Sequence, residues 1–178
     1  MDKPKTHRVF FALWPDLETR RAISRHAIPS LENVAGRNVD QHQWHITLAF
    51  LGNISEEMLT CVQQQAAQVS VQSFELTLDT VGYWSRPKVV WLGSQNMPDV
   101  LKTLVTDLNV ALKACGYEPE YKDFKAHMTL IRKVTRRPAN IQFMPITWQV
   151  EQFVLIESSF ASTGSDYRIL RQWSEVNK

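Results

Sequence analysis

Residues 45–52 read HITLAFLG and residues 127–132 read HMTLIR, so the motif His-apolar-Thr-Leu occurs twice, 82 residues apart. The chain has only five histidines in 178 residues, and chance then predicts about 0.3 copies of His-x-Thr. Both copies stand in apolar runs of the length and composition that favour strands. The repetition therefore predicts a pair of strands with a shared function.

A strand turns successive side chains to opposite faces, so His45 and Thr47 project together, as do His127 and Thr129. The apolar residue between each pair turns the other way and packs behind it. If the two strands face each other, two imidazoles and two hydroxyls line one groove.

Such a groove suits in-line displacement at phosphorus, because a neutral imidazole on one side can activate water while a charged imidazole opposite protonates the departing oxygen. Neither role needs a metal, and the hydroxyls of Thr47 and Thr129 can donate hydrogen bonds to the phosphate oxygens. Arg132 adds a charged donor. Strand alternation places residue 132 on the face opposite His127 unless the strand ends or twists first.

The remaining elements follow from periodicity and from turn residues. Three helices are predicted: one over about 16–27, one that begins after an N-cap at Ser55, and one from Pro98 to Ala114. Strands are predicted over 8–14 and 43–51, over 73–81 and 88–93 as a hairpin, over 148–160, and over 167–173 as a short last strand. The second half loosely echoes the first. We therefore predict an α+β fold of two pseudo-symmetric lobes, with antiparallel sheets facing each other across a central groove and helices outside, in a single bilobal domain over residues 1–178.

Composition narrows the function classes. A net charge of +2 is too small to indicate nucleic-acid binding through the overall charge of the protein. The chain has no Walker A or GxGxxG loop, so we predict neither ATP nor a dinucleotide cofactor. It has no apolar run long enough to span a bilayer, which leads us to expect a cytoplasmic protein. A monomer without an obligate protein partner is the default expectation. Cys61 and Cys115 belong to no ligand spacing, and we predict neither a disulfide nor structural zinc.

The two motifs, their spacing, the opening RVFFAL, the Arg of HMTLIR and the late SSF resemble the two-histidine (2H) phosphoesterase superfamily. Within it, the chain is most similar to the bacterial RNA 2′,3′-cyclic phosphodiesterases, also called 2′-5′ RNA ligases. The resemblance implies cofactor-free opening of RNA 2′,3′-cyclic phosphate ends to 2′-phosphates, with reversible ATP-independent 2′-5′ ligation. It also implies that His45 is the proton donor and His127 the proton acceptor, while Thr47, Thr129 and Arg132 hold the phosphate.

Several alternatives stay open. The same chemistry could act on a small cyclic nucleotide, a cyclic ADP-ribose phosphate or 2′-5′ oligoadenylate, and an RNA-binding module without chemistry is the third hypothesis. Structural histidines or a metal site are competing interpretations, although threonine is a poor partner for a metal. Phe10 and Phe11 are candidates for contact with a base, because alternation turns one of them outward beside the motifs.

The other three histidines are predicted to lie outside the site. His42 is expected on the solvated surface, His26 on a helix face, and His7 in a flexible terminus.

Overall fold

The structure is a computed structural model, and it describes residues 6–119, 123–139, 141–161 and 164–175. Eight strands form one antiparallel sheet in the order β10-β9-β1-β3-β7-β6-β5, with β2 also paired to β7, and β4 pairs with β8 in a second sheet. The strands are β1 (Thr6–Leu13), β2 (Arg37–Asn38), β3 (Ile46–Ser55), β4 (Phe74–Leu78), β5 (Thr80–Trp84), β6 (Val89–Gly93), β7 (His127–Arg132), β8 (Ile146–Val150), β9 (Gln152–Ala161) and β10 (Gly164–Ser174). The helices are α1 (Leu17–His26), α2 (Glu56–Ala66) and α3 (Asp99–Lys113), with short 3-10 turns at Ile28–Leu31 and Gln41–Gln43.

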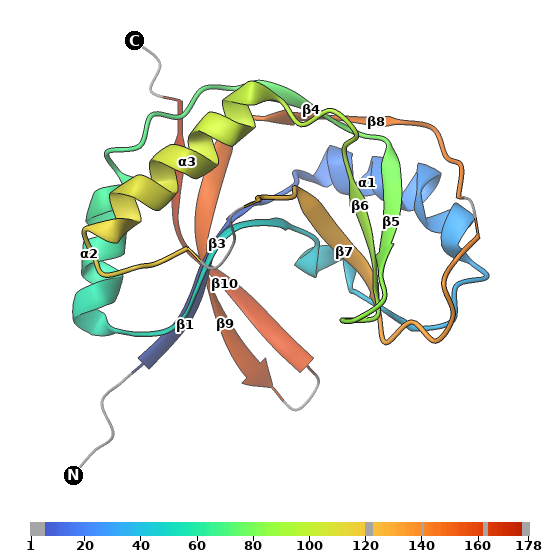
Figure 1. The fold of residues 1–178 in the computed structure, drawn as a ribbon, viewed down its shortest axis with the longest axis horizontal. Helices are drawn as coiled ribbons and strands as arrows, with labels where there is room; N and C mark the ends of the chain where they lie inside the picture. Colours follow the sequence, from blue (N-terminus) through green and yellow to red (C-terminus); the bar gives the residue numbers. More distant parts are fainter. Residues whose placement is uncertain (1–5, 120–122, 140, 162–163, 176–178) are drawn as a thin grey trace.

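The large sheet consists of two halves that meet at one point. Strands β3 and β7, which carry the two motifs, are paired only at Ile46 and Met128. Figure 1 shows the result: β10, β9, β1 and β3 diverge from β7, β6 and β5 like the arms of a V. The predicted α+β fold with two lobes is thus confirmed, with the added finding that the two lobes share a single sheet.

The helices begin and end where the sequence predicts. The side chain of Asp16 accepts a hydrogen bond from the Thr19 amide at 2.7 Å, and that of Ser55 accepts one from the Met58 amide at 3.2 Å. These are N-caps that satisfy free amides of α1 and α2. Gly116, with a φ of 80°, follows α3. Helices α2 and α3 pack beside the β1–β3 half, and α1 lies on the other side of the molecule against β8 (Figure 1). None of the helices described is both long and apolar enough to cross a bilayer.

The hairpin predicted from 73–81 and 88–93 is correct only in its second part. Strand β5 pairs with β6, whereas residues 74–78 leave the hairpin and pair with β8. The change of partner occurs at Asp79, whose carboxylate accepts hydrogen bonds from the Gln95 amide and the Thr80 hydroxyl. These hydrogen bonds hold Asp79 at the point where pairing with β8 ends and pairing with β6 begins. The alternation of apolar and polar residues continues through Asp79 and therefore does not reveal the change.

The C-terminal strands also differ from their predicted lengths. The expected long strand over 148–160 divides at Glu151 into β8 and β9, which belong to different sheets. The expected short last strand is the 11-residue β10, because it pairs along the whole of β9.

The prediction that the cysteines form no disulfide is wrong. Cys61 on α2 and Cys115 just beyond α3 are bonded, with their Cα atoms 5.8 Å apart and a sequence separation of 54. Packing of α2 against α3 brings the two residues together. Sequence spacing carries no record of that contact.

We predict that this bond contributes to stability. Closing a loop of 54 residues restricts the unfolded chain by about 4 kcal/mol in the loop-entropy account. Cys61→Ala or Cys115→Ala should therefore lower Tm by roughly 8–16 °C, measured by thermal unfolding without reductant. As a control, reductant should lower the Tm of the wild type but not that of the double variant. Two titratable thiols in the unreduced, denatured wild type would contradict the bond.

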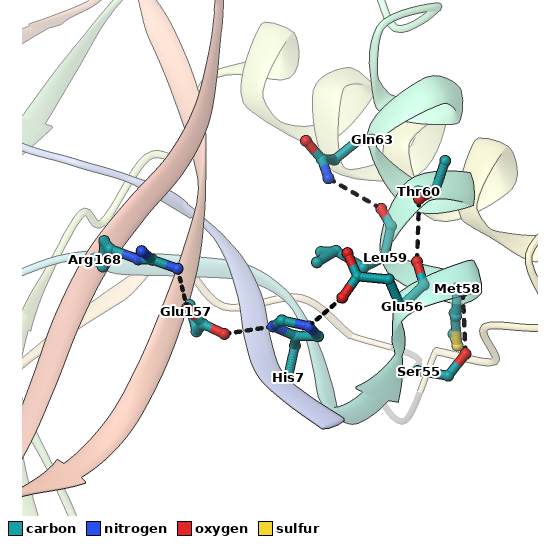
Figure 2. Close-up of polar contacts among 9 residues, drawn as sticks. All are labelled: His7, Ser55, Glu56, Met58, Leu59, Thr60, Gln63, Glu157 and Arg168. Atoms are coloured by element: carbon teal, nitrogen blue, oxygen red, sulfur yellow. Dashed lines mark hydrogen bonds and ion pairs between the residues drawn. The ribbon is translucent and has the colours of Figure 1, made fainter. Parts of the chain in front are cut away.

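His7 is a fixed, buried residue, so its predicted place in a flexible terminus is wrong. One ring nitrogen, Nδ1, lies 2.5 Å from a carboxylate oxygen of Glu157, and the other, Nε2, lies 2.7 Å from one of Glu56 (Figure 2). Arg168 donates to the second oxygen of Glu157. The cluster ties β1 to the first turn of α2 and to β9. Hydrogen bonds to Glu157 and Glu56 raise the pKa of His7.

We predict that the His7 cluster stabilises the fold most at low pH. A raised native pKa means that its contribution is complete below the ordinary histidine pKa of about 6.5 and is lost as pH rises through the native value. The Tm deficit of His7→Gln should thus be larger at pH 6 than at pH 9. The exposed His42 offers the matched variant His42→Gln, which should show no such pH-dependent deficit. An equal deficit for His7→Gln at both pH values would rule out a charged His7.

Candidate active site

The pairing of Ile46 with Met128 builds the site. Because the two strands are antiparallel, each motif histidine lies beside the threonine of the other motif, on the same face of the sheet. The four side chains border one cavity of about 180 Å³. Its lining residues are Val39, Gln43, His45, Thr47, His127, Thr129, Arg132 and Tyr167. The structure thus brings together all five residues expected to act on the phosphate.

Arg132 reaches the cavity because β7 contains a bulge. The register with β6 shifts by one residue between Val90/Ile131 and Trp91/Thr129, which leaves Leu130 as the extra residue on β7. A bulge of this kind reverses the alternation of side chains beyond it. Arg132 consequently joins the face of Thr129 instead of opposing it. From the sequence, the side of the strand on which Arg132 lies depended on whether the strand ends or twists before residue 132. The bulge at Leu130 places it on the side of the histidine.

Strand β3 has the same irregularity at the same motif position. Its register with β1 shifts between Phe11/Ala49 and Ala12/Thr47, so Leu48 is an extra residue there. In both motifs the leucine of His-x-Thr-Leu occupies the bulge. The two halves of the site are therefore related by an approximate two-fold axis near the central pair.

Both histidines are held by the main chain in the same way. Nδ1 of His45 lies 2.6 Å from the carbonyl oxygen of Gln43, and Nδ1 of His127 lies 2.8 Å from that of Lys125. A carbonyl can only accept, so each Nδ1 carries a proton. Nε2 is then the nitrogen available for proton exchange in each ring.

The surroundings favour neutral imidazoles. Burial lowers the pKa of His45 to about 4, against the opposing effect of the Gln43 carbonyl, and the positive charge of Arg132 lowers it further. Burial likewise lowers the pKa of His127, and Arg132 again adds to the effect. Without a bound anion, both rings are poised as proton acceptors at neutral pH.

Aromatic rings enclose His45. Its ring centroid lies 4.8 Å from that of Phe10, 5.5 Å from Tyr167 and 6.1 Å from Trp14. Trp14, the most distant of these three rings, lies against the buried Arg20: the guanidinium carbon is 4.7 Å from the Trp14 ring centroid. The guanidinium also donates a hydrogen bond to the main-chain oxygen of Pro15. These ring contacts hold the His45 imidazole in place and leave the residue only partly exposed.

His127 occupies a more open position. Among the aromatic residues that the structure describes, Trp84 is the one whose ring contacts that of His127, edge to face, with the centroids 4.4 Å apart. A second, larger cavity of about 790 Å³ begins here and shares Thr47, His127, Thr129 and Arg132 with the small one. Phe50, Trp84, Arg86, Tyr117, Phe124 and Lys125 are among the other lining residues. The small cavity is thus continuous with a wide groove of mixed aromatic and basic character.

The expected base contacts at Phe10 and Phe11 are not what the structure shows. Alternation separates the two rings: Phe10 lies on the site face beneath His45, and Phe11 packs in the main core with Phe153 and Trp173. They are 3% and 0% exposed, so neither offers a surface on which a base could stack. Phe10 instead supports the histidine.

Sequence reasoning missed Tyr167, Trp14 and Trp84. Tyr167 comes from β10, far along the chain, and no local pattern links it to His45. Trp84 stands five residues before β6 and reaches His127 only through the β5–β6–β7 pairing. His42 is exposed, as predicted, and His26 lies on α1. Among the described residues, no group of three or more His, Cys, Asp or Glu side chains could bind a metal.

Comparisons with known proteins agree with this architecture. A curated RNA 2′,3′-cyclic phosphodiesterase of Escherichia coli is 33% identical, over 98% of each chain. Another of Archaeoglobus fulgidus is 28% identical, over 92% of this chain and 98% of its own. The crystal structure of Escherichia coli LigT complexed with 3′-AMP superposes with a TM-score of 0.87 at 31% identity, covering 97% of this chain and 100% of that one.

The sequence model that describes the 2′-5′ RNA ligase superfamily matches residues 12–159, which include both His-x-Thr-Leu motifs. Together with the two bulged motifs and their shared cavity, this match shows that the chain belongs to the 2′-5′ RNA ligase superfamily.

Proposed function

We propose that this protein hydrolyses 2′,3′-cyclic phosphate ends of RNA to 2′-phosphomonoesters. Water attacks the cyclic phosphorus, the bond from phosphorus to O3′ breaks, and O3′ leaves as a hydroxyl. His127 accepts the proton of the attacking water, and His45 donates a proton to O3′. The same ring opening, with a 5′-hydroxyl in place of water as the attacking group, joins two ends through a 2′-5′ bond without ATP. The joining step is reversible, because attack of O3′ on the 2′-5′ phosphorus releases the 5′-hydroxyl and closes the cyclic phosphate again.

One observation carries the proposal: both His-x-Thr pairs border a single cavity of about 180 Å³, which is large enough to hold a phosphate group and its ester oxygens. The imidazoles come from different strands and so approach a bound phosphorus from two sides. Thr47 and Thr129 would donate to its non-bridging oxygens, and Arg132 would offset its charge. The E. coli and A. fulgidus relatives are both named RNA 2′,3′-cyclic phosphodiesterase, which supports this substrate class.

The proton states of the histidines follow from burial and charge. Desolvation keeps both rings neutral while the site is empty. A bound phosphodiester brings a negative charge close to both rings and raises their pKa values. Substrate binding therefore helps to load the proton that His45 gives to O3′.

The same residues would serve a cyclic mononucleotide, a cyclic ADP-ribose phosphate or 2′-5′ oligoadenylate. The groove of about 790 Å³ beside the catalytic cavity favours a substrate that extends beyond the cyclic phosphate, as an RNA end does, over a cyclic mononucleotide. Within this proposal the protein is a cytoplasmic monomer. Purified protein should be assayed on 2′,3′-cyclic mononucleotides and on cyclic-phosphate-ended oligoribonucleotides; failure on every substrate would favour a binding module.

We predict that both histidines are indispensable. His45→Ala and His127→Ala should each lower kcat by about 10²–10⁴-fold, as expected for a lost general acid or base. Activity of the wild type should persist in EDTA, since the imidazoles perform the proton transfers. His42→Ala, outside the site, is the matched control. Loss of less than tenfold in either motif variant would refute the paired mechanism.

We further predict a bell-shaped pH dependence. Burial lowers the pKa values of both free-enzyme histidines, so kcat/KM should be highest below about pH 6.5 and fall as pH rises, because the donor loses its proton. The kcat maximum, which reports the complex, should lie at higher pH. Initial rates at saturating and low substrate across pH 4–9 (roughly the stable range) separate the two profiles. A kcat/KM maximum above the kcat maximum would contradict this assignment.

A further inference from the structure

A large aromatic side chain stands exposed near the site without a role in the core. Phe160, close to the end of β9, is 79% exposed, the highest value among the exposed large hydrophobic residues described. Single apolar residues are common on protein surfaces and need no explanation by themselves. Phe160 differs because a cation is held against its ring.

That cation is Arg8 of β1. Its guanidinium carbon lies 5.4 Å from the centroid of the Phe160 ring and 4.9 Å from that of Phe50. Nη1 of Arg8 donates to the hydroxyl of Ser158 at 2.8 Å, and the same hydroxyl donates to the Arg8 carbonyl at 3.3 Å. The SSF segment, which the catalytic chemistry leaves unexplained, thus fixes Arg8 with its serine and covers it with its phenylalanine.

The Arg8–Phe160 pair is continuous with the catalytic site. Arg8 and Phe10 are two residues apart on β1 and share the face on which Phe10 supports His45. Phe50, the other ring against Arg8, lines the large groove. A nucleic-acid strand that leaves the groove past Phe50 would next meet the Arg8–Phe160 pair.

The chemistry of the pair fits a nucleotide. An exposed aromatic ring is a stacking platform for any base, and a guanidinium beside it can bind the linking phosphate. Among the described residues, no carboxylate lies within ion-pair distance of Arg8, and its side-chain partner is a neutral hydroxyl. Its charge is therefore available to an anion.

We propose that Arg8 and Phe160 bind the nucleotide that precedes the cyclic-phosphate end, with its base on the Phe160 ring and its phosphate at Arg8. The inference rests on the proposed function, and it adds a second nucleotide subsite outside the catalytic cavity. The site would then select RNA ends over free cyclic mononucleotides.

The first test compares a 2′,3′-cyclic mononucleotide with a dinucleotide that ends in the cyclic phosphate. For the wild type, kcat/KM should be higher on the dinucleotide by about 5- to 100-fold, the range expected from one stacked base. Phe160→Ala should remove most of this ratio, whereas Phe160→Tyr, which keeps the ring, should preserve it. Met144→Ala, at another exposed apolar residue, is the control.

The second test measures binding and does not depend on turnover. Fluorescence anisotropy with a labelled RNA hexamer ending in a 2′-phosphate gives Kd over a range of salt concentrations. Arg8→Ala should flatten the slope of log Kd against log salt by about 0.7, the value for one phosphate contact to a single strand. Phe160→Ala should weaken binding with the slope unchanged, because stacking involves no counterion.

The outcomes separate this inference from the proposed function. A wild type without hydrolysis on either substrate defeats the proposed function, and binding then decides the subsite. Hydrolysis with the same dinucleotide-to-mononucleotide ratio in the wild type and in Phe160→Ala overturns the subsite alone. Equal hexamer affinity in the wild type, Arg8→Ala and Phe160→Ala overturns it as well.

Discussion

One backbone pair, between Ile46 and Met128, determines the geometry of this protein. It is the only pair recorded between β3 and β7 in the described chain, yet it joins the two halves of the sheet. Further pairing would bring the strands side by side along their length and close the space between the lobes. The divergence beyond this pair leaves room for a phosphate on the face where both histidines project. The cavity between the two motifs is thus a consequence of how little the two strands are hydrogen-bonded.

The register around that pair explains why a near-symmetric sequence gives a functionally asymmetric site. Both motifs carry a bulge at their leucine, so the sixth residue of each, Phe50 or Arg132, turns toward the groove. One half therefore presents a ring and the other a cation. The surroundings of the histidines differ too, since three rings enclose His45 and one contacts His127. These differences arise from residues outside the repeated His-x-Thr-Leu motif.

The sequence was sufficient for what depends on alternation along a strand and on local caps. It predicted the two lobes, the three helices and the shared face of each His-Thr pair, because these follow from periods of two and 3.6 residues. It could not predict contacts between distant segments: Tyr167 at His45, the Cys61–Cys115 bond, or the carboxylates around His7. The wrong expectation of a base contact at Phe10 or Phe11 has the same origin. Strand alternation predicts that one of the two adjacent rings, Phe10 or Phe11, faces the site. That both rings are buried depends on the packing of β9 and β10 against β1, which alternation does not reveal.

The two hydrogen bonds that set the tautomers of His45 and His127 are accepted by main-chain carbonyls, two residues upstream in each case. Every one of the twenty amino acids supplies such a carbonyl, proline included. The residues at positions 43 and 125 can therefore be substituted without loss of either hydrogen bond, as long as the local backbone conformation is kept. In enzymes whose histidine is oriented by a carboxylate, a single codon change can remove the orienting group. Here the genetic code offers no such change, and the orientation of each imidazole is inherited with the fold itself.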